Sequence, residues 1–73
     1  MLFGEKVAML ASERGMKQKD ICIAANVKKQ TVSKIFQNQT TDPRMGTVIA
    51  IAEAFGMTPN ELIADVEFVK EPN

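Results

Sequence analysis

The chain has 73 residues, which is enough for one small domain but not for two separate cores. It contains no histidine and one cysteine, which excludes Ser-His and Cys-His catalytic pairs, an internal disulfide, and zinc sites built from imidazole or several thiolates. Nine basic and nine acidic residues cancel, which by itself argues against a nucleic-acid ligand. An enzyme that uses carboxylates or lysine alone remains conceivable, but no paired carboxylates in an apolar setting stand out. We therefore predict no enzyme, no metal site and no cofactor.

The apolar residues also indicate where the protein works. No apolar run approaches the roughly 20 residues of a membrane span, and the N-terminus lacks the layout of a signal peptide. A single cysteine is typical of a reducing compartment, and Cys22 is expected to be a small core residue rather than a redox sensor. We therefore expect a cytoplasmic protein with no membrane partner.

The charges are separated along the chain. Through Arg44 there are eight basic and four acidic residues, a net charge of +4. From Met45 onward there are one basic and five acidic residues, a net charge of −4. This asymmetry indicates a basic binding half and an acidic rear half, so the neutral total no longer excludes DNA.

Five helices are predicted in chain order, and the fold class is therefore all-α. The first helix should end at Gly15, and the second should run over about residues 18–25. Asn26 follows at the position just past the helix end, where a left-handed backbone is often needed. The third helix should span roughly residues 28–37, so the second and third helices are joined by a tight turn.

The last two helices are marked by their start signals. Asp42 followed by Pro43 predicts the start of the fourth helix, which should end at Gly56. Residues 58–61, Thr-Pro-Asn-Glu, form a predicted capping box for a short fifth helix. We expect the domain to cover residues 1–65, and residues 66–73 to form a tail that is a short strand or a frayed end.

The third helix is amphipathic. Val32 and Ile35 share one side, and the opposite side is polar over an arc of roughly 140°. The polar residues of this arc are Lys29, Gln30, Ser33, Lys34 and Gln37. Such side chains can reach phosphates and base edges, whereas an ordinary solvated helix face is the simpler alternative.

Residues 18–38 and their flanks resemble the lambda-repressor-like helix-turn-helix proteins, the Cro/CI or Xre type found in bacterial and phage regulators. The resemblance covers roughly residues 7–63 and implies a compact five-helix domain with the helix-turn-helix at its second and third helices. The matching residues are Leu10, Gly15, Met16, Gln18, Ile21, Val27, Thr31, Val32, Ser33, Ile35, Pro43, Thr47, Val48, Ile51, Ala52, Phe55, Gly56, Glu61 and Leu62.

The resemblance implies a set of DNA contacts. In that family the second helix of the motif lies in the major groove. The base-facing residues implied are Lys29, Gln30, Ser33 and Lys34. Gln18 would hold a phosphate at the start of the preceding helix. The backbone contacts implied on the flanks are Lys28, Asn38, Gln39, Thr40 and Arg44.

Several residues depart from the family pattern. Lys17 stands where Thr or Ser usually caps the second helix, so that helix start loses a side-chain acceptor worth about 1 kcal/mol. Asn26 and Asn38 stand where Gly is common, and both tolerate left-handed geometry. Ile23 and Phe36 are apolar where polar residues are usual, which indicates altered packing or an extra contact surface.

The fourth helix suggests a homodimer. Residues 48–52 are apolar on every side of the helix, and a helix of this kind is either fully buried or pressed against a partner. The interface residues expected are Ile49, Val66 and Phe68, with pairing of the tail as a strand across the dimer as an option. A two-fold dimer would place two recognition helices one DNA turn apart and predicts a palindromic operator.

The sequence therefore predicts a sequence-specific transcriptional regulator, a repressor, that acts on double-stranded DNA at the nucleoid and takes no small-molecule ligand. A Cro-like protein or an antitoxin that represses its own operon is a close variant of this hypothesis. The alternative is a protein-interaction module or antitoxin-like partner on the same fold, with weak or no DNA binding.

Overall fold

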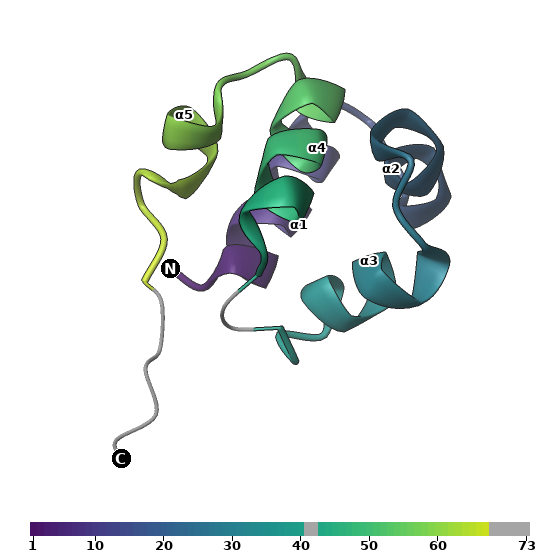
Figure 1. Ribbon diagram of the computed structural model, residues 1–73, viewed down its shortest axis with the longest axis horizontal. Coiled ribbons are helices and arrows are strands. Elements are labelled where there is room, and N and C mark those ends of the chain that lie inside the picture. The colour runs from purple at the N-terminus through teal and green to yellow at the C-terminus, as the bar shows by residue number, and fades with distance from the viewer. Residues whose placement is uncertain (41–42, 68–73) are drawn as a thin grey trace.

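The computed structural model of the chain describes residues 1–40 and 43–67. Within these ranges the chain forms five helices and no strand. The helices are α1 (Phe3–Glu13), α2 (Gln18–Ala25), α3 (Lys29–Phe36), α4 (Met45–Phe55) and α5 (Pro59–Ile63) (Figure 1). The predicted all-α class and the order of its five helices are confirmed, and α3 is one residue shorter at each end than the sequence predicts.

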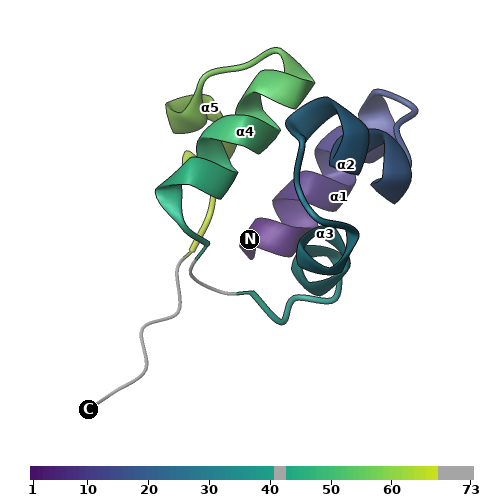
Figure 2. The same cartoon turned by 45° about the vertical axis from the view of Figure 1, so that its right-hand side comes forward.

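The helices divide into two sides around the middle of the molecule. α1 and α4 lie centrally, with α2 and α3 on one side and α5 on the other (Figure 1). α2 packs against α3 and α4, α1 packs against α3 and α5, and α4 packs against α5. Figure 2 shows α3 at the edge of the molecule, in contact with α1 and α2 through one face. The residues Lys29, Gln30, Lys34 and Gln37 on the other face of α3 are exposed.

Every helix contributes to one apolar core. The largest side chains that are fully buried are Phe3, Val7, Ile21, Val32, Ile35, Ile51 and Leu62. Burial of a side chain of this size stabilises a fold by about 1.5–3 kcal/mol. Because α3 supplies two of these residues, its position is fixed by the same core that holds the rest of the domain.

The four longer helices end in the same way. A residue with left-handed backbone follows each helix, and the next residue donates its N–H to a carbonyl of the last helical turn, as in a Schellman motif. These residues are Gly15, Asn26, Asn38 and Gly56, with φ of 64°, 54°, 60° and 72°. The predicted stops at Gly15, Asn26 and Gly56 are confirmed, and Asn26 and Asn38 both adopt the left-handed conformation.

The start of α2 lacks a capping side chain, as the sequence predicts. Lys17 occupies the N-cap position and makes no side-chain cap bond. Asp20 compensates in part for the missing cap bond, because its Oδ2 accepts the N–H of Lys17 at 2.8 Å. In α5 the predicted cap is present: Thr58 Oγ1 accepts the N–H of Glu61 at 3.2 Å and donates to its Oε1 at 3.0 Å.

The predicted start of α4 is wrong. The N-cap residue is Arg44, with φ of −67° and ψ of 148°, and the helix begins at Met45. Pro43 lies before the cap rather than in the first turn, and Asp42 lies outside the described residues. Proline disfavours helical backbone in the residue before it, while its own φ near −65° suits both the first helical turn and an extended segment, so it can mark the approach to a helix without fixing the first turn.

α1 approaches α3 closely at Gly4. A Cβ atom built on Gly4 would collide with the carbonyl oxygen of Ile35 and with Oδ1 of Asn38. The first turn of α1 therefore packs directly on the backbone at the C-terminal end of α3. Any side chain at position 4 would push the two helices apart.

The residues after α5 are tied back to α1. Lys6 is buried, and its Nζ lies 3.1 Å from Oδ2 of Asp65. Glu67 donates its N–H to the carbonyl oxygen of Met1 at 2.8 Å, and Val66 packs against the core. None of the helices in residues 1–40 and 43–67 is long and apolar enough to cross a lipid bilayer.

Candidate nucleic-acid interface

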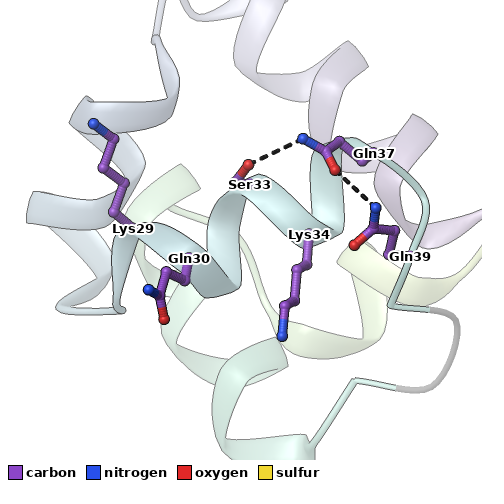
Figure 3. Close-up of a pocket in the computed structure, with 6 residues that line it drawn as sticks. All are labelled: Lys29, Gln30, Ser33, Lys34, Gln37 and Gln39. Carbon is purple, nitrogen blue, oxygen red and sulfur yellow. Dashed lines mark hydrogen bonds between the residues drawn. The ribbon is translucent and has the colours of Figure 1, made fainter.

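The outward face of α3 and the loop after it form an open hollow of about 550 Å³. Its walls are Lys29, Gln30, Ser33, Lys34, Gln37 and Gln39 (Figure 3). Val32 and Ile35, on the opposite face, are 1% and 0% exposed. The amphipathic pattern of α3 is thus what directs the polar residues outward, and we call this surface the reading face.

The two lysines and Gln30 extend away from the helix. Figure 3 shows the side chains of Lys29, Gln30 and Lys34 pointing outward, with no hydrogen bond drawn to any of them. The ion pairs among the described residues, Lys6 with Asp65 and Arg14 with Glu13, involve no lysine of α3. Within the described chain their ammonium groups therefore remain available to an anionic or acceptor-rich ligand.

The other end of the reading face is internally hydrogen-bonded. Gln37 donates its Nε2–H to Oγ of Ser33 at 3.3 Å and accepts the Nε2–H of Gln39 on its Oε1 at 2.9 Å (Figure 3). Gln39 comes near Gln37 because the left-handed Asn38 folds the chain back, so that the Gln39 N–H bonds the carbonyl of Lys34 at 2.9 Å. The polar arc of the sequence includes Gln37, but sequence reasoning assigned it no role.

A second hollow of about 380 Å³ lies between α3 and the start of α4. Two predicted backbone contacts, Thr40 and Arg44, line it. Thr31 and Thr47 line it as well, and sequence reasoning missed them because they belong to different helices and share no local pattern. The lining residues carry hydroxyl and guanidinium donors, and the hollow adjoins the start of α4, whose first N–H groups have no side-chain cap.

Three predicted contact residues lie outside both hollows. Gln18 is the exposed first residue of α2, and Lys28 is the exposed N-cap of α3. Asn38 points its Oδ1 toward Gly4 of α1, where it contributes to the contact between α1 and α3. The structure therefore groups seven of the ten predicted DNA contacts in the two hollows and leaves these three apart.

The predicted dimer residues have different surroundings. Ile49 is 39% exposed and Met45, one turn earlier on α4, is 59% exposed. Val48, Ile51 and Ala52 are buried in the core, which accounts for most of the apolar run without a partner. Val66 is half-buried, and Phe68 lies outside the described residues.

The two residues that are apolar where the family is usually polar differ in burial. Ile23 is 78% exposed on α2, so its side chain contributes little to the fold. Phe36 is half-buried and packs against the core, as does Cys22.

Arg14 is fixed between α1 and α4. Its Nε donates to the carbonyl oxygen of Phe55 at 3.2 Å, and its guanidinium lies 5.4 Å from the centroid of the Phe55 ring. Arg14 therefore links α1 to α4 and is not part of the reading face.

The two short helices α2 and α3, the left-handed turn at Asn26 and the outward polar face of α3 define a helix-turn-helix protein. The chain belongs to the Cro/C1-type helix-turn-helix DNA-binding domains, whose family model matches residues 6–67. The family membership that the sequence resemblance predicts is thereby confirmed.

A curated relative is the HTH-type transcriptional regulator DdrOP3 of Deinococcus deserti. It is 33% identical over 64 residues, a match that covers 88% of this chain and 49% of the relative. The chain thus spans about half the length of this relative.

Proposed function

We propose that this chain is a sequence-specific transcriptional repressor that acts as a homodimer on a palindromic operator. The reading face of α3 carries the proposal, because it gathers ammonium, amide and hydroxyl groups on the outward side of the second helix of a helix-turn-helix. A helix of this kind fits the major groove of B-DNA, where each base pair presents a distinct pattern of donors and acceptors.

Each part of the reading face suits a type of base edge. Gln30 can bond N6 and N7 of adenine with its amide, and Lys29 and Lys34 can donate to O6 and N7 of guanine. All three side chains are exposed and extend outward from α3. They are therefore the residues to which we assign base discrimination.

The second hollow suits a phosphate of the DNA backbone. Thr40, Thr47 and Arg44 offer hydroxyl and guanidinium donors beside the uncapped N-terminus of α4. Gln18 at the start of α2 and Lys28 at the start of α3 would hold neighbouring phosphates. Contacts of this kind set affinity and register rather than sequence preference.

The homodimer would form through the exposed apolar residues of α4. Met45 and Ile49 lie one turn apart on the same face, and we assign Val66 and Phe68 to the same interface. A two-fold arrangement would space two reading faces by about 34 Å, one turn of DNA. Occupation of such an operator can repress transcription by excluding polymerase.

Selection of bound sequences from a random DNA pool tests this function. We expect a palindromic site with half-sites one turn apart, and an affinity that falls steeply with salt, by roughly 0.9 in the log-log slope for each phosphate contact. A pool that shows no enrichment, or binding that does not depend on salt, would contradict the proposal.

The dimer has its own test. Ile49→Glu should give monomers in sedimentation and a lower affinity for the two-half-site operator, with Glu53→Gln on the same exposed side of α4 as a control. A folded Ile49→Glu dimer of normal affinity would show that the interface lies elsewhere.

The second candidate function is a protein-interaction module on the same fold. Ile23, 78% exposed on α2, favours it, because its apolar side chain lies outside the core and is accessible to a partner. Under this alternative Ile23→Lys would abolish partner binding, and variants of the reading face would leave it unchanged.

A further inference from the structure

Gln37 lies in the reading face, and its side chain is needed neither for the core nor for the backbone hydrogen bonds of α3. It is the C-cap residue of α3 and is exposed, so its side chain is not needed for packing. Its backbone N–H bonds the carbonyl of Ser33 at 3.0 Å, while its side-chain Nε2 bonds the hydroxyl of the same residue at 3.3 Å. Gln37 is thus held next to Ser33 through both its backbone and its side chain.

Gln39 fixes the orientation of the Gln37 amide. Its Nε2–H donates to Oε1 of Gln37 at 2.9 Å, which turns Nε2 of Gln37 toward Ser33. The three side chains form a chain of hydrogen bonds that runs in one direction, from Gln39 through Gln37 to Ser33 (Figure 3). At its end the oxygen of Ser33 accepts a bond on one of its two lone pairs, so the hydroxyl hydrogen and a single remaining lone pair are left to face the ligand.

We propose that Gln37 is a specificity-determining residue that makes Ser33 a hydrogen-bond donor toward the DNA base it faces. The inference rests on the proposed function. A serine hydroxyl alone can donate or accept and therefore distinguishes poorly between bases. With one lone pair of its oxygen engaged by Gln37, Ser33 donates more readily than it accepts, and it therefore favours bases that offer an acceptor in the major groove.

The groups that each base presents in the major groove determine which bases Ser33 favours. Adenine, guanine and thymine all present an acceptor there, namely N7, N7 with O6, and O4. Cytosine presents only the N4 donor, which meets the Ser33 hydrogen unfavourably. Gln37 therefore disfavours cytosine at the position that Ser33 faces.

The test compares operator preferences selected from a random DNA pool by the full chain and by three variants. Ser33→Ala identifies the operator position concerned, as the one whose preference it changes. Gln37→Ala should make cytosine acceptable there, with a two- to tenfold rise in its relative affinity, roughly the value of one hydrogen bond. Gln37→Glu should favour cytosine or adenine, because a carboxylate can only accept and forces Ser33 to present its oxygen to the base.

A second comparison separates an action through Ser33 from a contact that Gln37 makes itself. In the Ser33→Ala background, Gln37→Ala should cause no further change in preference. A change of equal size in both backgrounds would overturn the proposal, because Gln37 would then read a base directly. Unaltered preference in Gln37→Ala and Gln37→Glu would also overturn it.

Two controls keep the outcomes distinct. Asn60→Ala removes an exposed side-chain amide on α5 and should leave preference unchanged. Thermal unfolding of both Gln37 variants should match that of the unmodified chain, because Gln37 is exposed. If the unmodified chain selects no sequence, the proposed function fails; if it selects a sequence that Gln37 does not influence, only the role of Gln37 fails.

Discussion

α3 and α4 show two ways in which a small domain uses a helix. α3 buries Val32 and Ile35 and turns an almost wholly polar face outward. α4 buries Val48, Ile51, Ala52 and Phe55 and has few polar residues on any side. α3 therefore has a free face whose residues can change without loss of the core, whereas changes in α4 act first on stability. The comparison separates the residues that we propose contact DNA from the residues that hold α3 in place.

The largest expected effect comes from the buried side of α4. Ile51→Ala should lower the free energy of unfolding by about 2–5 kcal/mol, because Ile51 is 0% exposed and its truncation leaves a cavity. Urea denaturation measures the change. Ile49→Ala, at 39% exposure on the same helix, should cost clearly less, and equal costs would show that α4 has no distinct buried face.

The contact between α1 and α3 provides the next effect. Gly4→Ala should destabilise the fold by about 1–3 kcal/mol and weaken operator binding, because the new methyl group displaces the C-terminal end of α3. Gly46→Ala is the matched control, since a Cβ there meets nothing within 4 Å and a helical Ala should stabilise by about 0.4–1 kcal/mol. Thermal unfolding should give the two variants shifts of opposite sign.

On the free face of α3 the effect should be on recognition rather than stability. Gln30→Ala should cost about 1–3 kcal/mol of operator binding and relax the preference at one base, while leaving the unfolding transition unchanged. Competition between operator and random DNA measures the preference. An equal loss of affinity for both DNAs would assign Gln30 to the backbone instead.

The smallest effect is expected at the edge of the interface. Arg44→Ala should weaken binding to all sequences alike and reduce the salt slope by about 0.9, as expected when one phosphate contact is lost. Arg14→Ala serves as control, because Arg14 is bonded to the Phe55 carbonyl and should affect stability but not the slope. A slope unchanged by Arg44→Ala would remove that residue from the phosphate contacts.

Much of the fold could be predicted because its signals are local. The left-handed positions Gly15, Asn26, Asn38 and Gly56 mark the ends of four helices, and the spacing of Val32 and Ile35 fixes which side of α3 is polar. The start of α4 was misplaced because proline is compatible with several positions before a helix, and only the path of the chain selects among them.

The grouping of the candidate site was only partly predictable. The members of the reading face come from one helix and the loop directly after it, so helical periodicity brings most of them together. The second hollow joins Thr31 of α3 to Thr47 of α4, and nothing in the sequence between them indicates that they meet. Its existence depends on the angle at which α4 returns to the core.

The sequence by itself determined the helix-turn-helix, its family and the polar side of its second helix, since each depends on residues within a few turns of one another. The tertiary structure decided three further points. The end of α3 packs directly against Gly4 of α1, and Arg14 links α1 to α4. A chain of hydrogen bonds runs from Gln39 through Gln37 to Ser33. These depend on how close two segments come and which way a side chain turns. Only packing of the whole domain sets those distances and directions.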